Sequence, residues 1–232
     1  MAYPIFDMHC DTADRLVRRK LPSSYNEVEG MSFCMSDDDP QDPCSLASSA
    51  GHISLDKIGD TPWAQCFACF VPDELTPEQA ADFHSRVMRN LAEQAAENAD
   101  RATTVDFAHE IRPVLEGEGE PHVAAIHTIE NARMFAHDLG LVENYAQNGL
   151  LMASLSWNAA GPLASGHDTN EGVTEAGRAA IREMARLHVA LDVSHLNDRC
   201  FAEVAALTDE PLVASHSNAR AVCGHRRNLT DE

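Results

Sequence analysis

Three histidines and two carboxylates in this sequence follow short apolar runs and have the side chains that bind divalent metals. They are His9, Asp11, Glu130, His195 and His216. Neutral imidazoles and carboxylates are the ligand set of Zn²⁺ or a similar ion. Each residue alone is a weak signal, since His9 and Asp11 also fit a buried histidine beside an aspartate that caps a helix. Taken together, the five residues predict a metal centre.

The spacing of these residues favours a centre that holds two ions. His9 and Asp11 are two positions apart at the end of an extended segment, so their side chains share a face. Two metal ions roughly 3.5–4 Å apart need a bridging carboxylate. Glu130 has candidate ligands on either side of it in the sequence and suits that role.

The elements that must position these residues alternate between strand and helix. Apolar runs of strand length precede each candidate ligand, and helical periodicity fills most of the intervals. The predicted strands cover 3–9, 64–71, 122–128, 150–156, 189–194 and 211–215, and the predicted helices cover 11–20, about 76–98, about 174–187 and about 197–207. Such alternation predicts an α/β fold with a parallel sheet, whose strands carry chemistry at their carboxyl ends. Residues 22–62 have the composition of a loop.

Two of these helices begin with residues that cap helices well, and a third begins with a capping box. Thr76-Pro77-Glu78-Gln79 has the capping-box pattern with proline at the first helical position. Thr174 and Asn197 are the predicted N-caps of the two later helices.

Composition excludes several classes of partner. The chain has 232 residues with 17 Lys+Arg against 37 Asp+Glu, a formal charge of −20, which would repel nucleic acid and anionic membrane surfaces. Its 44% hydrophobic residues suffice for a core, and we expect a single domain over 1–232. No apolar run approaches a membrane span, the N-terminus lacks a signal-peptide pattern, and the seven cysteines are scattered. We therefore expect a cytoplasmic protein with no membrane or nucleic-acid partner. A homodimer is the assembly that we keep open.

The order of these motifs resembles the membrane dipeptidase (renal dipeptidase) family of zinc peptidases over essentially the whole chain. The most similar stretch is SHSNARAVCGHRRN over 215–228. Also similar are FDMHCDT over 6–12, WAQCF over 63–67, and MARL with LDVSH within 184–195. The resemblance implies a (β/α)8 barrel of the TIM type, of which about the first six strands are present here. It also implies that the substrate is a dipeptide.

The resemblance also implies a role for each ligand in a site with two zinc ions. His9 and Asp11 would bind one ion, His195 and His216 the other, and Glu130 would bridge them. A hydroxide bridging the two ions would attack the peptide carbonyl.

Arg227 matches the family arginine that binds the substrate near the reacting carbonyl, so Arg227 and Glu130 are the catalytic candidates.

The chain departs from the family in two places. Glu130-Asn131-Ala132 stands where the family usually has Glu-Gly-Gly or Glu-Gly-Ala. Trp157 stands where many members carry a histidine that contacts the substrate. A tryptophan can stack on a substrate or line its pocket but cannot exchange protons near neutral pH. Trp157 is therefore a predicted substrate-binding residue, in a pocket for a more apolar or different dipeptide.

Two alternatives to a dipeptidase stay open. Six predicted strands fall short of the eight in a closed barrel, and the family aspartate that relays a proton would lie on a strand beyond Glu232. We therefore expect the C-terminal part to be missing, so the chain could be an inactive metal-binding fragment that exposes its core. The other alternative is an amidohydrolase acting on cyclic amides or lactams, since fold does not fix substrate.

Overall fold

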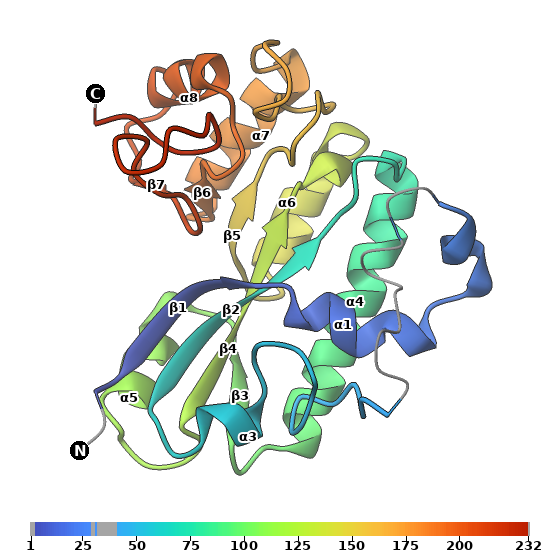
Figure 1. Cartoon of the computed structure of the whole chain (residues 1–232), viewed down its shortest axis with the longest axis vertical. Helices are drawn as coiled ribbons and strands as arrows, with labels where there is room; N and C mark the ends of the chain where they lie inside the picture. The colour runs from blue at the N-terminus through green and yellow to red at the C-terminus, as the bar shows by residue number, and fades with distance from the viewer. Residues whose placement is uncertain (1–2, 29–30, 32–40, 232) are drawn as a thin grey trace. The chain divides into compact units, whose positions relative to one another are not determined.

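Parallel strands alternate with helices along the chain, as the apolar runs predict (Figure 1). The computed structural model describes residues 3–28, 31 and 41–231. Its strands are β1 (Ile5–Cys10), β2 (Trp63–Phe70), β3 (Ala102–Val105), β4 (Val123–Glu130), β5 (Leu150–Ser154), β6 (Ala190–Asp192) and β7 (Leu212–Val213). All six predicted strands are present, close to their predicted bounds. β3 was not predicted, because its four residues include two threonines and form no apolar run.

The α-helices are α1 (Thr12–Val17), α3 (Leu55–Ile58), α4 (Pro77–Glu97), α5 (Ile111–Leu115), α6 (Gly140–Ala146), α7 (Glu175–Arg186) and α8 (Asp198–Ala205). Short 3₁₀ turns cover η1 (Arg18–Lys20), η2 (Ser23–Glu27), η3 (Ala108–Glu110) and η4 (Arg133–Ala136). The four predicted helices are confirmed as α1 with η1, α4, α7 and α8. The segment 22–62, predicted as a loop, contains η2 and α3, and its residues 29–30 and 32–40 lie outside the described part.

The predicted helix starts are confirmed by their hydrogen bonds. In the capping box of α4, the Thr76 N–H donates to Gln79 Oε1 at 2.9 Å and the Gln79 N–H donates to Thr76 Oγ1 at 3.3 Å. Thr174 Oγ1 accepts a hydrogen bond from the Gly177 N–H at the start of α7. Asn197 Oδ1 accepts a hydrogen bond from the Cys200 N–H at the start of α8. These bonds satisfy backbone N–H groups that have no partner within the helix.

The chain divides into two compact units. The first comprises Met1–Phe70 and Asp82–Thr128, and the second Val71–Ala81 and Ile129–Glu232. In the first unit the strand order is β1-β2-β4, with β3 also paired to β4. In the second unit β5, β6 and β7 pair in that order, with Ser154 opposite Asp192 and Asp192 opposite Val213. This register places the residues that follow these three strands at one edge of the sheet.

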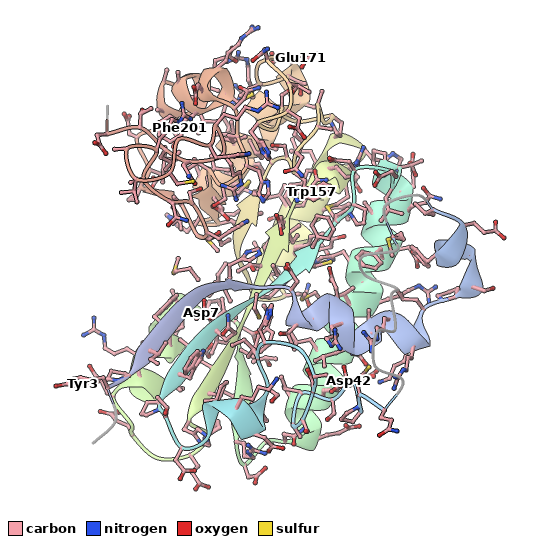
Figure 2. All side chains as sticks on the ribbon, in the orientation of Figure 1. Tyr3, Asp7, Asp42, Trp157, Glu171 and Phe201 are labelled. Atoms are coloured by element: carbon pink, nitrogen blue, oxygen red, sulfur yellow. The ribbon has the colours of Figure 1, made fainter. Side chains whose placement is uncertain are left out.

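A buried carboxylate organises the N-terminal part of the first unit. Asp42, labelled in Figure 2, lies 2.7 Å from Arg15 Nε and 3.5 Å from Arg18 Nη2. Its Oδ1 accepts hydrogen bonds from the N–H groups of Cys44 and Ala50. Burial alone would raise the pKa of Asp42, but these hydrogen bonds and Arg15 outweigh it and lower the pKa to about 2.

The helices of the described residues give no sign of a membrane span. None of them combines the length and the apolar character that crossing a bilayer requires.

Candidate metal centre

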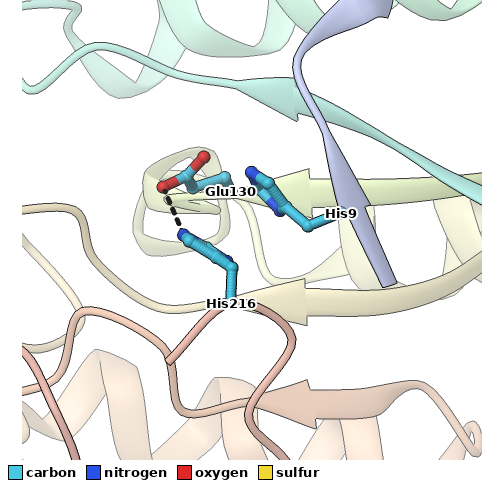
Figure 3. A group of neighbouring side chains, drawn as sticks. All are labelled: His9, Glu130 and His216. Carbon is cyan, nitrogen blue, oxygen red and sulfur yellow. Dashed lines mark ion pairs between the residues drawn. The ribbon is translucent and has the colours of Figure 1, made fainter. Parts of the chain in front are cut away.

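Three of the predicted ligands meet in the second unit. Glu130 is the last residue of β4, His195 follows β6, and His216 follows β7. Glu130 Oε1 lies 2.7 Å from His195 Nε2 and 3.5 Å from His216 Nε2, and the two Nε2 atoms are 2.9 Å apart. Figure 3 draws the pair of Glu130 and His216 with its dashed line. The structure therefore brings together a carboxylate and two imidazoles from three strand ends.

His195 is oriented by a side chain behind it. Its Nδ1 lies 3.0 Å from Asn158 Oδ1, which accepts the Nδ1 proton. The backbone of His195 has φ 72°, in the left-handed region that residues other than glycine rarely adopt. Burial lowers the pKa of His195, against the opposing effect of Glu130. The ring is therefore neutral near pH 7, which is the form that binds metals.

His216 is oriented by a longer chain of hydrogen bonds. Its Nδ1 lies 2.7 Å from Ser215 Oγ, and that hydroxyl donates to Asp192 Oδ2. Asp192 Oδ1 accepts from the N–H groups of Ser194 and Ser215. Asp192 thus fastens the end of β6 to the end of β7 and, through Ser215, sets the ring of His216. These bonds give a physical reason for the Asp-x-Ser-His pattern over 192–195 at the end of β6 and for the Ser-His pair over 215–216 after β7.

These outer partners determine where the protons of the two imidazoles lie. Because Asn158 Oδ1 takes the Nδ1 proton of His195, the Nε2 of that ring carries a lone pair. Ser215 donates its own proton to Asp192, so it accepts from Nδ1 of His216, and that Nε2 also carries a lone pair. Two lone pairs and a carboxylate oxygen therefore face one another. Such an arrangement is repulsive without a positive charge among them, so the residues fit a bound metal cation.

Asn131 supports Glu130 from the next position in the chain. Its φ is 67°, and asparagine is one of the few residues other than glycine that adopt this region readily. Its N–H donates to Ser154 Oγ at 2.9 Å, and its Nδ2 donates to the Val71 carbonyl at 2.7 Å and to Asp73 Oδ1 at 3.0 Å. Asn131 thus adopts a backbone conformation that a glycine there would also allow.

The other two predicted ligands lie together in the first unit. His9 Nε2 is 3.3 Å from Asp11 Oδ1. Between Asp7 and Cys10, β1 advances three residues while its partner β2 advances two, so a β-bulge lies in the segment that contains His9. Asp11 occupies the N-cap position of α1, but its side chain makes no capping hydrogen bond. Its buried Oδ1 accepts no hydrogen bond from any described residue, so the helix-cap alternative does not explain this carboxylate.

The two predicted substrate-binding residues both belong to the second unit. Trp157 (Figure 2) follows β5, and its ring centroid is 6.3 Å from that of His195. Arg227 Nη1 donates to Ser217 Oγ at 2.6 Å, while its buried Nη2 has no hydrogen-bond partner among the described residues. Burial lowers the pKa of Arg227, and the carboxylates of Glu130 and Asp192 oppose this. Arg227 therefore offers one free donor close to acidic groups of the cluster.

The structure adds Asn158 and His167, which the sequence did not single out. Asn158 follows Trp157 directly, and an amide beside a predicted pocket residue was the available signal. His167 lies in a loop and follows no strand, so the rule of strand ends missed it. Its side chain is 11% exposed, and its ring centroid is 6.0 Å from that of His195. Burial lowers the pKa of His167, with Asp168 acting against this and Arg227 with it.

Metal-binding side chains at the carboxyl ends of parallel strands in an α/β fold are typical of metal-dependent hydrolases. The profile of the family described as membrane dipeptidase (Peptidase family M19) matches residues 1–232, and the chain belongs to this family. The family is one of metallopeptidases, which implies a metal cofactor.

Solved structures and a human protein are similar to the chain. A metallopeptidase from Rhodobacter sphaeroides, liganded with a phosphinate mimic of the dipeptide L-Ala-D-Ala, has 28% identity and a TM-score of 0.79 over 100% of this chain and 70% of its own. A dipeptidase of family M19 has 29% identity and a TM-score of 0.79 over 100% of this chain and 68% of its own. Human Dipeptidase 3 is 22% identical over 100% of this chain and 44% of its own length. With the parallel strands, these likenesses confirm the predicted fold class, part of a (β/α)8 barrel.

Proposed function

We propose that this chain hydrolyses the peptide bond of dipeptides at a centre of two zinc ions. The observation that carries the proposal is the convergence of Glu130 Oε1, His195 Nε2 and His216 Nε2, whose lone pairs need a cation. Membership of the membrane dipeptidase family directs this chemistry to dipeptides. Imidazole and carboxylate ligands suit zinc.

The five predicted ligands divide between the two ions in this proposal. His195 and His216 hold one, His9 and Asp11 hold the other, and Glu130 is shared. Zinc at such a centre lowers the pKa of a water molecule toward neutrality and polarises the scissile carbonyl.

The residues around the ligands bind and orient the substrate. Arg227 is held through Nη1 by Ser217, so its guanidinium is fixed in place to bind the substrate near the reacting carbonyl. Trp157 packs near the ring of His195 and supplies an apolar wall for a substrate side chain. Neither residue needs to move a proton to perform these roles.

The test is to measure the metal content of the purified chain and its hydrolysis of L-Ala-L-Ala and L-Ala-D-Ala after loading with zinc. We expect close to two metal ions per chain and release of free alanine. In His195→Ala, the metal content should fall and hydrolysis should drop at least 100-fold, because the remaining ligands lack one imidazole. His52→Ala, which removes an exposed histidine, is the matched control and should change neither quantity.

Two outcomes would contradict this proposal. Metal-loaded protein that releases no alanine from either dipeptide would favour the metal-binding fragment. If the chain takes up no zinc, the proposed metal centre is wrong.

A further inference from the structure

The loop after β5 folds back on itself in a way that only a glycine permits. Gly166 lies so close to the strand end that an added Cβ would be 1.9 Å from the Trp157 carbonyl oxygen. The Gly166 N–H donates to the Ala159 carbonyl at 2.8 Å, and the Asp168 N–H donates to the Asn158 carbonyl at 2.9 Å. We call residues 157–168 the β5 hairpin. Its backbone pairing carries the next residue, His167, back toward the strand end from which the loop starts.

The β5 hairpin presents two rings to His195. The centroid of Trp157 is 6.3 Å and that of His167 is 6.0 Å from the ring of His195. An antiparallel bridge between Gly166 and Leu196 fastens the hairpin to the residue after His195. His167 is therefore fixed next to a predicted metal ligand by backbone contacts on both of its sides.

His167 also reaches Arg227 through one intermediate ring. The ring of His167 meets the ring of His225 edge-on, with centroids 5.6 Å apart. The backbone N–H of Arg227 donates to Nδ1 of His225 at 3.1 Å. Metal ligand, His167 and Arg227 are thus neighbours in one small region of the second unit.

Two buried polar atoms in this region have no partner. His167 Nδ1 and Arg227 Nη2 make no hydrogen bond to any residue that the structure describes. Burial without a partner costs free energy. Burial has the larger effect in lowering the pKa of the His167 ring, and the guanidinium of Arg227 is near enough to lower it further. A single ligand between the two side chains would satisfy both atoms. The carboxylate of Asp168 lies 3.8 Å from His167 Nε2 and is already paired with Arg226 at 2.7 Å. The ligand that suits a guanidinium and an imidazole N–H in these surroundings is an anionic oxygen group.

We propose that His167 is a substrate-binding residue whose Nδ1, with Arg227 Nη2, receives the carboxylate of the dipeptide. This inference rests on the proposed dipeptidase function and deepens it, because it assigns a residue that selects substrates with a free carboxylate. A hydrogen bond to a charged group contributes enough to change affinity about 10–100-fold.

The experiment compares the acid and amide forms of one substrate. We would measure the dissociation constants of L-Ala-L-Ala and L-alanyl-L-alaninamide by calorimetry, and kcat/KM for both, with zinc-loaded wild type and His167→Ala. Wild type should prefer the acid. His167→Ala should weaken binding of the acid about 10–100-fold and leave binding of the amide nearly unchanged.

Three comparisons separate substrate binding from other roles. His167→Asn places an amide N–H near the position of Nδ1 and should recover part of the preference for the acid. The metal content and the melting temperature of His167→Ala should equal those of wild type, whereas a metal ligand would lower the metal content. His137→Ala, which removes a half-exposed histidine paired with Glu78, should leave every quantity unchanged.

Failure of the proposed function and failure of the His167 assignment give different results. If wild type binds dipeptides but hydrolyses none, the proposed function fails, while the acid and amide affinities still test His167. An equal preference for the acid in wild type and His167→Ala would overturn the assignment of His167. So would a wild type that binds neither compound.

Discussion

The two units hold their predicted metal ligands in different ways. In the second unit, His195 and His216 are each oriented by a partner behind the ring, Asn158 for one and Ser215 for the other. In the first unit, Asp11 Oδ1 accepts no hydrogen bond within the described residues, although it lies 3.3 Å from His9 Nε2. The second unit therefore has a preorganised set of predicted ligands, while no hydrogen bond from a described residue orients Oδ1 of the predicted carboxylate ligand in the first. Preorganised ligands bind more tightly because less freedom is lost on binding.

The largest expected effect is on metal content, and it distinguishes Glu130, the ligand proposed to be shared by both ions, from Asp11, proposed to bind only one. Glu130→Gln removes the only carboxylate of the second-unit cluster, so the chain should lose most of both metal ions and hydrolysis should fall at least 1,000-fold, or about 4 kcal/mol. Asp11→Asn should lose one ion and keep the other. Elemental analysis after dialysis against buffer distinguishes the two variants. Equal metal loss in both would show that the five ligands act as one set and that the comparison between units is wrong.

A smaller effect is expected from the residue behind His216. Ser215→Ala leaves every ligand in place but removes the hydroxyl that links His216 Nδ1 to Asp192. Metal affinity should fall about 10–100-fold, the range found when such outer partners are removed. Competition with a zinc chelator measures this, and Ser48→Ala on an exposed loop is the control. Unchanged affinity in Ser215→Ala would mean that the ring of His216 needs no support.

The third prediction concerns stability in the first unit. The pKa of Asp42 is lowered from 3.8 to about 2, so its carboxylate stabilises the fold fully above about pH 4 and progressively less as the pH falls toward 2. The corresponding contribution is about 2 kcal/mol. Urea unfolding between pH 6 and pH 2 should show this loss in wild type. In Asp42→Asn, the loss between these pH values should be smaller by about that amount, because no carboxylate titrates there.

The smallest expected effect is at a helix start. Thr76→Ala removes one side of the capping box of α4 and should lower the free energy of unfolding by about 1 kcal/mol without altering metal content. Thr208→Ala, outside any helix start, is a comparison for the loss of a threonine. A loss of metal in Thr76→Ala would show that this helix positions the ligands more directly than its hydrogen bonds indicate.

Periodicity and capping residues were enough to predict most of the fold. The apolar runs locate six strands because buried strands need such runs, and Thr174 and Asn197 mark helix starts because few residues can cap a helix. β3 escaped because its short sequence, Ala-Thr-Thr-Val, is stabilised by pairing with β4 and not by its own pattern. Pairing of this kind depends on distant residues and leaves no local signal.

The rule of strand ends selected residues that lie together in the structure, but it missed a neighbouring residue in a loop. Glu130, His195 and His216 follow strands, and the structure brings them together in one unit. Their roles as ligands, and those of His9, Asp11, Trp157 and Arg227, stay predictions. His167 was missed because its place depends on the backbone pairing of residues far along the loop, which no spacing rule describes.

The β5 hairpin affects how the substrate preference of this protein could change in evolution. The predicted metal ligands belong to strand ends, where a change would disturb the sheet, whereas Trp157 and His167 lie on one contiguous piece of sequence that Gly166 closes. If Trp157 and His167 bind the substrate as proposed, exchange of this one segment would change the substrate preference and leave the predicted metal ligands in place. This arrangement depends on Gly166. Any larger side chain there would clash with the Trp157 carbonyl and separate the rings of Trp157 and His167.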